Sequence, residues 1–175
     1  GVVSNLVTRR MQSALLNRYQ AQLMLRVSEL EEMASRDELT GLHNRRHFHQ
    51  VLNAEVGKAQ DCKEPLALIL MDVDKLKTIN DEYGHGVGDV IIASLGRVIA
   101  KHVRGSDVAA RLGGDEFGIV MPSTDKRGAF TLAKRLLDEL DRTPMYEEGE
   151  TKVMITISIG VSGFPWGGES VEELI

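Results

Sequence analysis

The sequence predicts an α+β domain, in which helices pack against a sheet, preceded by an N-terminal helix. Three observations favour this class. Residues 65–71 form an apolar run of strand length, residues 111–121 place a Gly-Gly pair between two β-prone segments, and residues 88–103 and 128–140 carry helical apolar patterns. Helices and an antiparallel hairpin mixed in this way indicate a sheet covered by helices.

The first predicted element is the N-terminal helix, residues 1–36, which contains no proline and no glycine after Gly1. Leu16, Leu23 and Leu30 recur every seven residues, with Val27 and Ala34 at the alternate positions. This spacing predicts a coiled-coil seam of about two and a half heptads, shorter than a secure seam. The alternative is a helix packed on its own domain. The predicted division is therefore 1–36 for the helix and 37–175 for the second domain.

The remaining elements follow in order from hydrophobic periodicity. Within the second domain the pattern predicts a helix at 45–58, a loop around Asp61, and a strand that ends at Asp72. After the helix at 88–103 and a strand near 108–110, we expect strands at 117–121 and 152–161 on either side of the helix at 128–140. Pro122 is expected to end the first of these two strands. Val153, Ile155, Ile157 and Ile159 alternate along the second.

The Gly113-Gly114 pair predicts a tight hairpin, because only glycine takes a positive φ at both turn positions without steric cost. Asp115 and Glu116 follow and are expected to project from its tip. Adjacent carboxylates repel each other unless a proton or a cation lies between them. A solvated acidic turn would be the ordinary interpretation if no other acidic cluster existed.

A second acidic cluster follows the apolar strand, as Asp72-Val73-Asp74. Alternation places Asp72 and Asp74 on the same side of the strand. Two carboxylates at the end of a buried strand are costly without a counter-ion, and Mg²⁺ prefers such oxygen ligands. The two clusters together favour a metal site.

These segments resemble the GGDEF domain family, the diguanylate cyclases that condense two GTP into cyclic di-GMP and pyrophosphate. Residues 113–117 spell the signature, and residues 37–46, 72–89 and 157–161 are similar to three further motifs in the family order. The resemblance extends from about Asp37 to the last residue. It implies a palm-like βαββαβ sheet of the ferredoxin-like or nucleotide-cyclase-like kind.

The resemblance also implies the catalytic and metal residues. Asp72, Asp115 and the Val73 carbonyl would hold Mg²⁺, with Mn²⁺ as a possible substitute. Asp115 would also accept a proton from the attacking hydroxyl, although a metal-bound water is an alternative base. Glu116 would assist at the metal, and Lys77 would face the phosphates. Asp74 is open between a structural and a metal-binding role.

Two further groups of residues are carried over from the family. Asn80 and Asp89 would recognise guanine, with His85 contacting the nucleotide or supporting the loop. Arg104 and Asp107, which end five residues before Gly113, would form an inhibitory site for the product dimer, supported by Arg135. The family makes its product between two facing domains, so a homodimer held by the N-terminal helix is expected.

Composition narrows the class of partner. The formal net charge is −5, and the first 36 residues carry five basic and three acidic groups, so the remainder is more acidic still. Such a domain lacks the basic footprint of a duplex binder, so neither DNA nor RNA is an expected partner. The single cysteine, Cys62, excludes an internal disulfide and suits a reducing cytoplasm; we expect it in a polar loop, without a catalytic role. No apolar stretch is long enough to span a membrane, and whether a parent protein is membrane-tethered stays open.

One feature departs from the family. After Val161 the family continues through a helix with phosphate-holding basic residues and a final strand, whereas residues 169–175 match only the opening of that helix. Two alternatives to a cyclase stay open: a non-catalytic receptor that binds cyclic di-GMP through Arg104 and Asp107, and an unrelated palm-like module that binds Mg²⁺ and a nucleoside triphosphate.

Overall fold

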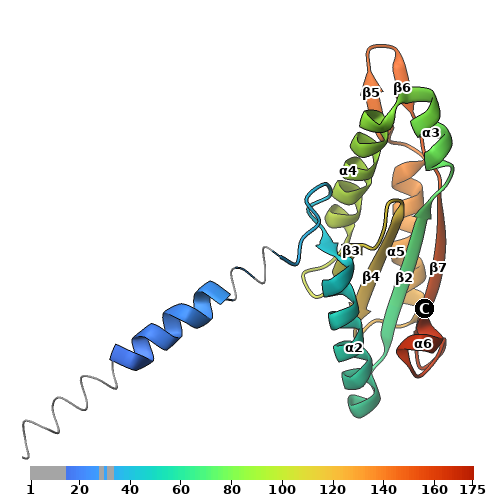
Figure 1. The fold of residues 1–175 in the computed structure, drawn as a ribbon. Helices are drawn as coiled ribbons and strands as arrows, with labels where there is room; N and C mark the ends of the chain where they lie inside the picture. Colours follow the sequence, from blue (N-terminus) through green and yellow to red (C-terminus); the bar gives the residue numbers. More distant parts are fainter. Residues whose placement is uncertain (1–14, 28–29, 31–33) are drawn as a thin grey trace, which may run out of the picture. The chain divides into compact units, whose positions relative to one another are not determined.

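The computed structural model describes residues 15–27, residue 30 and residues 34–175 (Figure 1). By its internal contacts the chain divides into two compact units, Gly1–Ser35 and Arg36–Ile175. Among the described residues, no helix combines the length and the apolar character needed to cross a membrane.

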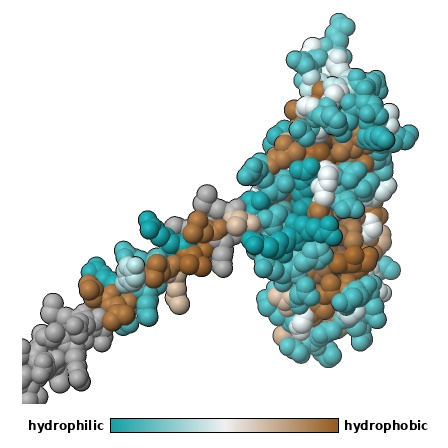
Figure 2. Space-filling view, viewed as in Figure 1, coloured by the Kyte–Doolittle hydropathy of each residue, from teal (hydrophilic) through white to brown (hydrophobic). Residues whose placement is uncertain are grey.

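Within the first unit, residues 15–27 form a helix. Its large apolar side chains are exposed, as the hydrophobic residues along it in Figure 2 show; they include Leu16, Leu23 and Val27. Leu16, Leu23 and Val27 of the predicted seam therefore lie on an exposed helix, and pairing with a second chain stays a prediction. The predicted end of the helix at residue 36 was wrong, because residues 34–35 form a turn and Arg36 pairs with His43 in a β-bridge. The predicted helix at residues 1–14 lies outside the described residues.

The second unit is built on a five-stranded sheet of order β1-β3-β4-β2-β7. β1 pairs with β3 in parallel, and every other neighbouring pair in this sheet is antiparallel. The strands are β1 His43–Asn44, β2 Leu66–Val73, β3 Val108–Arg111, β4 Glu116–Pro122 and β7 Ile157–Phe164. A separate hairpin joins β5, Tyr146–Glu148, to β6, Thr151–Val153.

Helices cover both faces of this sheet (Figure 1). The apolar side chains of β2 alternate between two cores: Ala67, Ile69 and Met71 pack with α4 and α5, whereas Leu66 and Leu68 pack with α2. Burying each large aliphatic side chain contributes about 1.5–3 kcal/mol. The helices are α2 Arg45–Cys62, α3 Leu76–Tyr83, α4 His85–His102, α5 Lys126–Leu140 and α6 Val171–Leu174. The predicted α+β class, with an N-terminal helix, is confirmed.

Side-chain caps explain where two of these helices begin. Asn44 Oδ1 accepts a hydrogen bond from the His47 amide at 3.0 Å, and Asp125 Oδ1 accepts one from the Gly128 amide at 2.8 Å. Such caps satisfy backbone donors that lack an intrahelical partner. The cap at Asp125 starts α5 at Lys126, two residues before the predicted position.

Other elements also differ from their predicted bounds. The helix predicted at 88–103 is α4, which begins three residues earlier, at His85. The helix predicted to end at residue 58 continues to Cys62, so Cys62 is the exposed last residue of α2 instead of a loop residue. The buried face of α2 explains why the helix continues past residue 58, because Val56 and Ala59 continue the apolar stripe that Phe48 and Leu52 begin.

The single strand predicted at 152–161 is two strands. β6 ends at Val153 and β7 begins at Ile157. Val153, Ile155 and Ile157 are all buried, so the alternation persists across the break. The pairing does not persist, because β6 pairs with β5 whereas β7 pairs with β2. The hydrophobic periodicity predicts which residues are buried, but it does not show where the partner strand changes.

Candidate active site

The two acidic clusters meet at the end of two paired strands. Asp72 of β2 lies directly opposite Glu116 of β4 in the antiparallel register. The Val73 amide donates to the Asp115 carbonyl at 3.1 Å. The strand pairing thus brings together four residues predicted to act at the metal: Asp72, Val73, Asp115 and Glu116. Glu116 belongs to the strand, so its predicted place at the hairpin tip was wrong.

The electrostatics of this cluster favour a cation. Partial burial raises the pKa of Asp72, and the negative charges of Asp115, Glu116 and Asp74 raise it further. An open cavity of about 310 Å³ lies beside the cluster, lined by Asp72, Glu116, Arg45, His49 and apolar side chains that include Phe48 and Leu70. Positive charge placed here would stabilise the ionised carboxylates.

Asp74 makes different contacts. One carboxylate oxygen accepts from Thr156 Oγ1 at 2.6 Å, and the other accepts from Ser158 Oγ at 2.7 Å. These hydroxyl donors lower the pKa of Asp74, in the direction opposite to Asp72. Since both oxygens bind β7 and the segment before it, the contacts favour the structural role for Asp74.

The donor set suits Mg²⁺ but does not enclose it. Within the described part of the chain, no three His, Cys, Asp or Glu side chains are grouped so that they could hold a metal ion by themselves. Mg²⁺ commonly takes only one or two carboxylates and completes its shell with water and substrate phosphates. Carboxylates of Asp72 and Asp115 with a backbone carbonyl fit that pattern.

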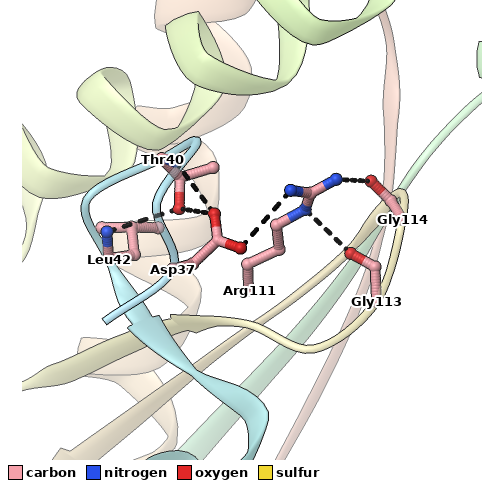
Figure 3. Close-up of polar contacts among 6 residues, drawn as sticks. All are labelled: Asp37, Thr40, Leu42, Arg111, Gly113 and Gly114. Atoms are coloured by element: carbon pink, nitrogen blue, oxygen red, sulfur yellow. Dashed lines mark hydrogen bonds and ion pairs between the residues drawn. The ribbon is translucent and has the colours of Figure 1, made fainter. Parts of the chain in front are cut away.

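The loop that carries the glycines is held by a side chain that sequence reasoning did not single out. Arg111 ends β3, and its Nε and Nη2 donate to the carbonyls of Gly113 and Gly114, each at 2.9 Å (Figure 3). Its Nη1 lies 3.4 Å from Asp37 Oδ2. Arg111 stands directly before Leu112 and the signature, but nothing in the local pattern links it to Asp37.

The predicted hairpin is present, but its turn was predicted wrongly. Residues 112–115 connect β3 to β4, and neither Gly113 nor Gly114 has a positive φ, unlike Gly41, Gly84 and Gly149. The absence of a side chain still matters at Gly113, where a Cβ would lie 2.8 Å from the Glu116 carboxylate. Because this carboxylate is the end of a flexible side chain, the contact is a mild constraint on Gly113, and a left-handed conformation is not one.

The predicted nucleotide residues lie on α3 and α4, which pack together. α3 was not predicted, although Leu76, Ile79 and Tyr83 have helical spacing. Lys77 and Asn80 lie three residues apart on α3, and His85 and Asp89 lie four apart on α4, so each pair shares a helix face. Lys77, His85 and Asp89 are exposed, and no described residue forms an ion pair with Lys77.

Asn80 has an unusual environment. Its Oδ1 is buried and has no hydrogen-bond partner among the described residues. A Cβ on Gly88 would lie 1.9 Å from that oxygen, so the amide occupies space that only glycine leaves free. Buried polar atoms are rarely left unbonded in proteins, so this oxygen lacks a partner that the described residues do not supply.

The three residues of the predicted inhibitory site line one separate open pocket of about 510 Å³. Arg104 and Asp107 are joined by a turn, in which Asp107 Oδ2 accepts from the Arg104 amide at 2.8 Å. Arg135 and Arg127 reach the pocket from α5, and His102 reaches it from the end of α4; sequence reasoning missed Arg127 and His102. Arg127 lies eight residues before Arg135, a spacing that returns to a similar helix face, but it falls outside the predicted helix start.

The sheet order and the acidic strand ends define a palm-like α+β domain of the nucleotide-cyclase kind. The chain matches the family model described as "Diguanylate cyclase, GGDEF domain" over residues 34–175. It therefore belongs to the GGDEF domain family, and the family predicted from the sequence is confirmed.

Three curated relatives match most of this chain. The response regulator PleD of Caulobacter vibrioides is 37% identical over 82% of this chain and 32% of its own length. Diguanylate cyclase A of Treponema denticola is 31% identical over 89% of this chain and 42% of its own length. The cyclic di-GMP phosphodiesterase NbdA of Pseudomonas aeruginosa is 38% identical over 93% and 20%. The chain thus spans less than half of each relative.

Solved structures share the fold. Diguanylate cyclase SiaD of Pseudomonas aeruginosa, solved with its activator SiaC, has a TM-score of 0.80 at 29% identity, covering 95% of this chain and 65% of that one. The GGDEF domain of DgcB from Caulobacter crescentus, solved with c-di-GMP, has a TM-score of 0.70 at 28% identity, covering 74% and 75%.

Proposed function

We propose that the protein is a diguanylate cyclase, which condenses two GTP into cyclic di-GMP and pyrophosphate with Mg²⁺. The observation that carries this proposal is the meeting of Asp72, Val73, Asp115 and Glu116 at one strand end, beside α3 and its buried, unbonded Asn80 oxygen. The relatives named diguanylate cyclase support it. The relative named a phosphodiesterase is matched over only 20% of its length, against 42% for diguanylate cyclase A, so the name of the cyclase weighs more in this proposal.

The carboxylates of Asp72 and Asp115, with the Val73 carbonyl, would hold the metal. Bound Mg²⁺ would neutralise the phosphates and the pyrophosphate leaving group. Asp115 would accept the proton of the attacking 3′-hydroxyl, and Glu116 would orient its neighbours. Lys77, exposed at the start of α3, would bring its ammonium to the phosphates.

Guanine would be recognised by two side chains of opposite character. The Asp89 carboxylate would accept from the N1 and N2 hydrogens, which adenine does not present in this arrangement. The amide of Asn80 would pair with another edge of the base and so satisfy its buried oxygen. His85, one helical turn before Asp89, would contact the nucleotide or support the loop.

Two GTP molecules require two domains that face each other, so we propose a homodimer held through the N-terminal helix. Product bound by Arg104, Asp107 and Arg135 would inhibit the enzyme. The guanidinium groups suit phosphate or the Hoogsteen edge of guanine, and the carboxylate suits guanine N1 and N2. The open pocket that these residues line supports this part of the proposal.

The test incubates the full chain with Mg²⁺ and GTP, then separates the nucleotides by chromatography, with ATP in a parallel reaction. Asp115→Asn should lose at least about 100-fold in turnover, because a charge is removed where the metal and the proton acceptor meet. Asp138→Asn, at an exposed position of α5, is the matched control and should behave as the parent. No cyclic di-GMP from a dimeric parent preparation would refute the proposal.

A receptor for cyclic di-GMP is the second candidate, because the product pocket is separate from the acidic strand end. Calorimetry distinguishes the two. Binding of cyclic di-GMP without binding of GTP would favour the receptor, whereas preference for GTP over ATP favours the cyclase. Equal binding of ATP and GTP would favour a general nucleotide module.

A further inference from the structure

We propose that Arg111 is a positioning residue for the reaction, and that Asp37 orients Arg111. This inference rests on the proposed function, because the loop that Arg111 holds carries Asp115. The described side-chain hydrogen bonds of Arg111 and Asp37 go to each other, to Thr40 and to the glycine carbonyls, and not to the side chains of the acidic cluster. Both residues would act through the backbone of residues 112–115.

Arg111 forms hydrogen bonds to two consecutive carbonyls of the loop at residues 112–115. Its Nε and Nη2 donate to Gly113 and Gly114, each at 2.9 Å, so the planar guanidinium spans both peptide groups (Figure 3). The loop's own backbone contributes little beyond the Leu112 amide, which donates to the Glu116 carbonyl at 2.8 Å, and a longer bond of 3.4 Å from Gly113. The guanidinium is therefore the main clamp on the two glycine peptides.

Asp37 is itself fixed before it reaches Arg111. Its Oδ1 accepts from the Thr40 amide at 2.9 Å and from Thr40 Oγ1 at 2.7 Å. This leaves Oδ2 for Arg111, at 3.4 Å from Nη1. Thr40 packs closely on α4, because a Cβ added at Gly96 would lie 2.8 Å from Thr40 Cβ. The turn at 37–40 is thus braced against α4.

The arrangement fixes the peptide that leads into Asp115 from both sides. Arg111 holds the carbonyls before it, and the Val73 amide donates to the Asp115 carbonyl at 3.1 Å. The side chains of Arg111 and Asp37 are only 18% and 23% exposed, so water competes weakly for the Arg111–Gly113 bond and the Arg111–Asp37 contact, whereas the bond to Gly114 is exposed. Without the guanidinium, the glycine peptides would be free to rotate, and the Asp115 carboxylate would lose its fixed position relative to Asp72.

The test compares Arg111→Lys and Asp37→Asn with the parent in the full chain. Lysine keeps the charge but cannot span two carbonyls, so kcat should fall roughly tenfold or more, while KM for GTP stays within about twofold. In Asp37→Asn, kcat should fall by a smaller factor. In the double variant, kcat should fall by less than the product of the two single factors, because both residues act through the same contacts. Amide hydrogen exchange at residues 112–116 should rise in both single variants.

Lys101→Met is the matched control, because it removes an ion pair of similar type, with Glu139 at 3.0 Å, on α4 and α5. It should leave kcat and the exchange of residues 112–116 unchanged. Parent-like kcat and exchange in Arg111→Lys, or a change confined to KM, would overturn the inference while leaving the cyclase intact. If the parent itself makes no cyclic di-GMP, the proposed function fails, and exchange at 112–116 still decides whether Arg111 holds the loop. If Arg111→Lys does not fold, Asp37→Asn must show the same changes for the inference to stand.

Discussion

Asn80 and Gly88 show how one side chain can occupy the space that a missing side chain leaves free. The buried Asn80 oxygen occupies the place that a Cβ on Gly88 would fill. Gly86, two residues earlier on the same helix, has open space around it and an ordinary φ. The two glycines therefore have different roles, although both lie in the first turn of α4.

Gly88→Ala should weaken GTP binding by about tenfold or more, because the methyl group displaces the Asn80 amide, and 1.4 kcal/mol of lost interaction is a factor of ten. Isothermal calorimetry with GTP measures the effect. Gly86→Ala is the control and should bind GTP as the parent does. Equal affinities for the two variants would show that Asn80 does not contact the base.

His47 predicts part of the pH dependence of stability. Its pKa is lowered by partial burial and then by the positive charges of Arg36 and Arg46, and its ring stacks on His43. The unfolded chain therefore binds the proton more readily than the folded chain. As the pH falls below the ordinary histidine pKa of 6.5, the free energy of unfolding decreases; above that pH the contribution of His47 is constant. His47→Gln should flatten the fall in Tm between pH 7.5 and 5.5, measured by differential scanning fluorimetry. An unchanged slope would contradict this.

Among the elements, α2 and β4 pack closely against each other at Phe48 and Gly118. A Cβ at Gly118 would lie 2.5 Å from the Phe48 ring, which is fully buried. Gly160 of β7, by contrast, has only an ordinary contact with the Leu70 carbonyl at 4.0 Å. The distance between helix and sheet therefore depends on Gly118 in β4, and it does not depend on Gly160 in β7.

Gly118→Ala should lower the free energy of unfolding by about 1–3 kcal/mol, because the extra methyl group overpacks the core between α2 and the sheet. Gly160→Ala should change it by less than about 1 kcal/mol, since alanine and glycine differ by that amount in strand and helix interiors. Urea denaturation followed by circular dichroism measures both. A destabilisation of the same size in both variants would remove the packing explanation.

The molecule as a whole has two compact units, and its proposed chemistry needs two copies of the second. Leu16, Leu23 and Leu30 lie on the first unit and are 59%, 48% and 65% exposed. Exposed leucines at this spacing are costly in water unless a partner helix covers them. Linking two domains in this way would raise their effective concentration.

Replacing these three leucines with serine should convert a dimer to a monomer in light scattering across a dilution series. The same preparation should show cyclase activity that falls more steeply on dilution than the parent's. The control replaces Arg18 and Gln22, exposed polar residues of the same helix, with serine and should keep the parent's mass. Identical masses for both variants would end the coiled-coil hypothesis and leave the active site proposal standing.

The sequence by itself determined the class of fold, the buried strand β2, the hairpin and the two acidic clusters, because periodicity and local composition decide which segments form strands, helices and turns. The tertiary structure decided which residues contact one another across long stretches of sequence. Asp37 meets Arg111 across 74 residues, and Asp74 is taken by Thr156 and Ser158 across 82 and 84. It also separated β6 from β7 within one alternating run. Such contacts depend on strand register and on how helices pack, which are properties of the whole sheet and are not encoded in any local spacing.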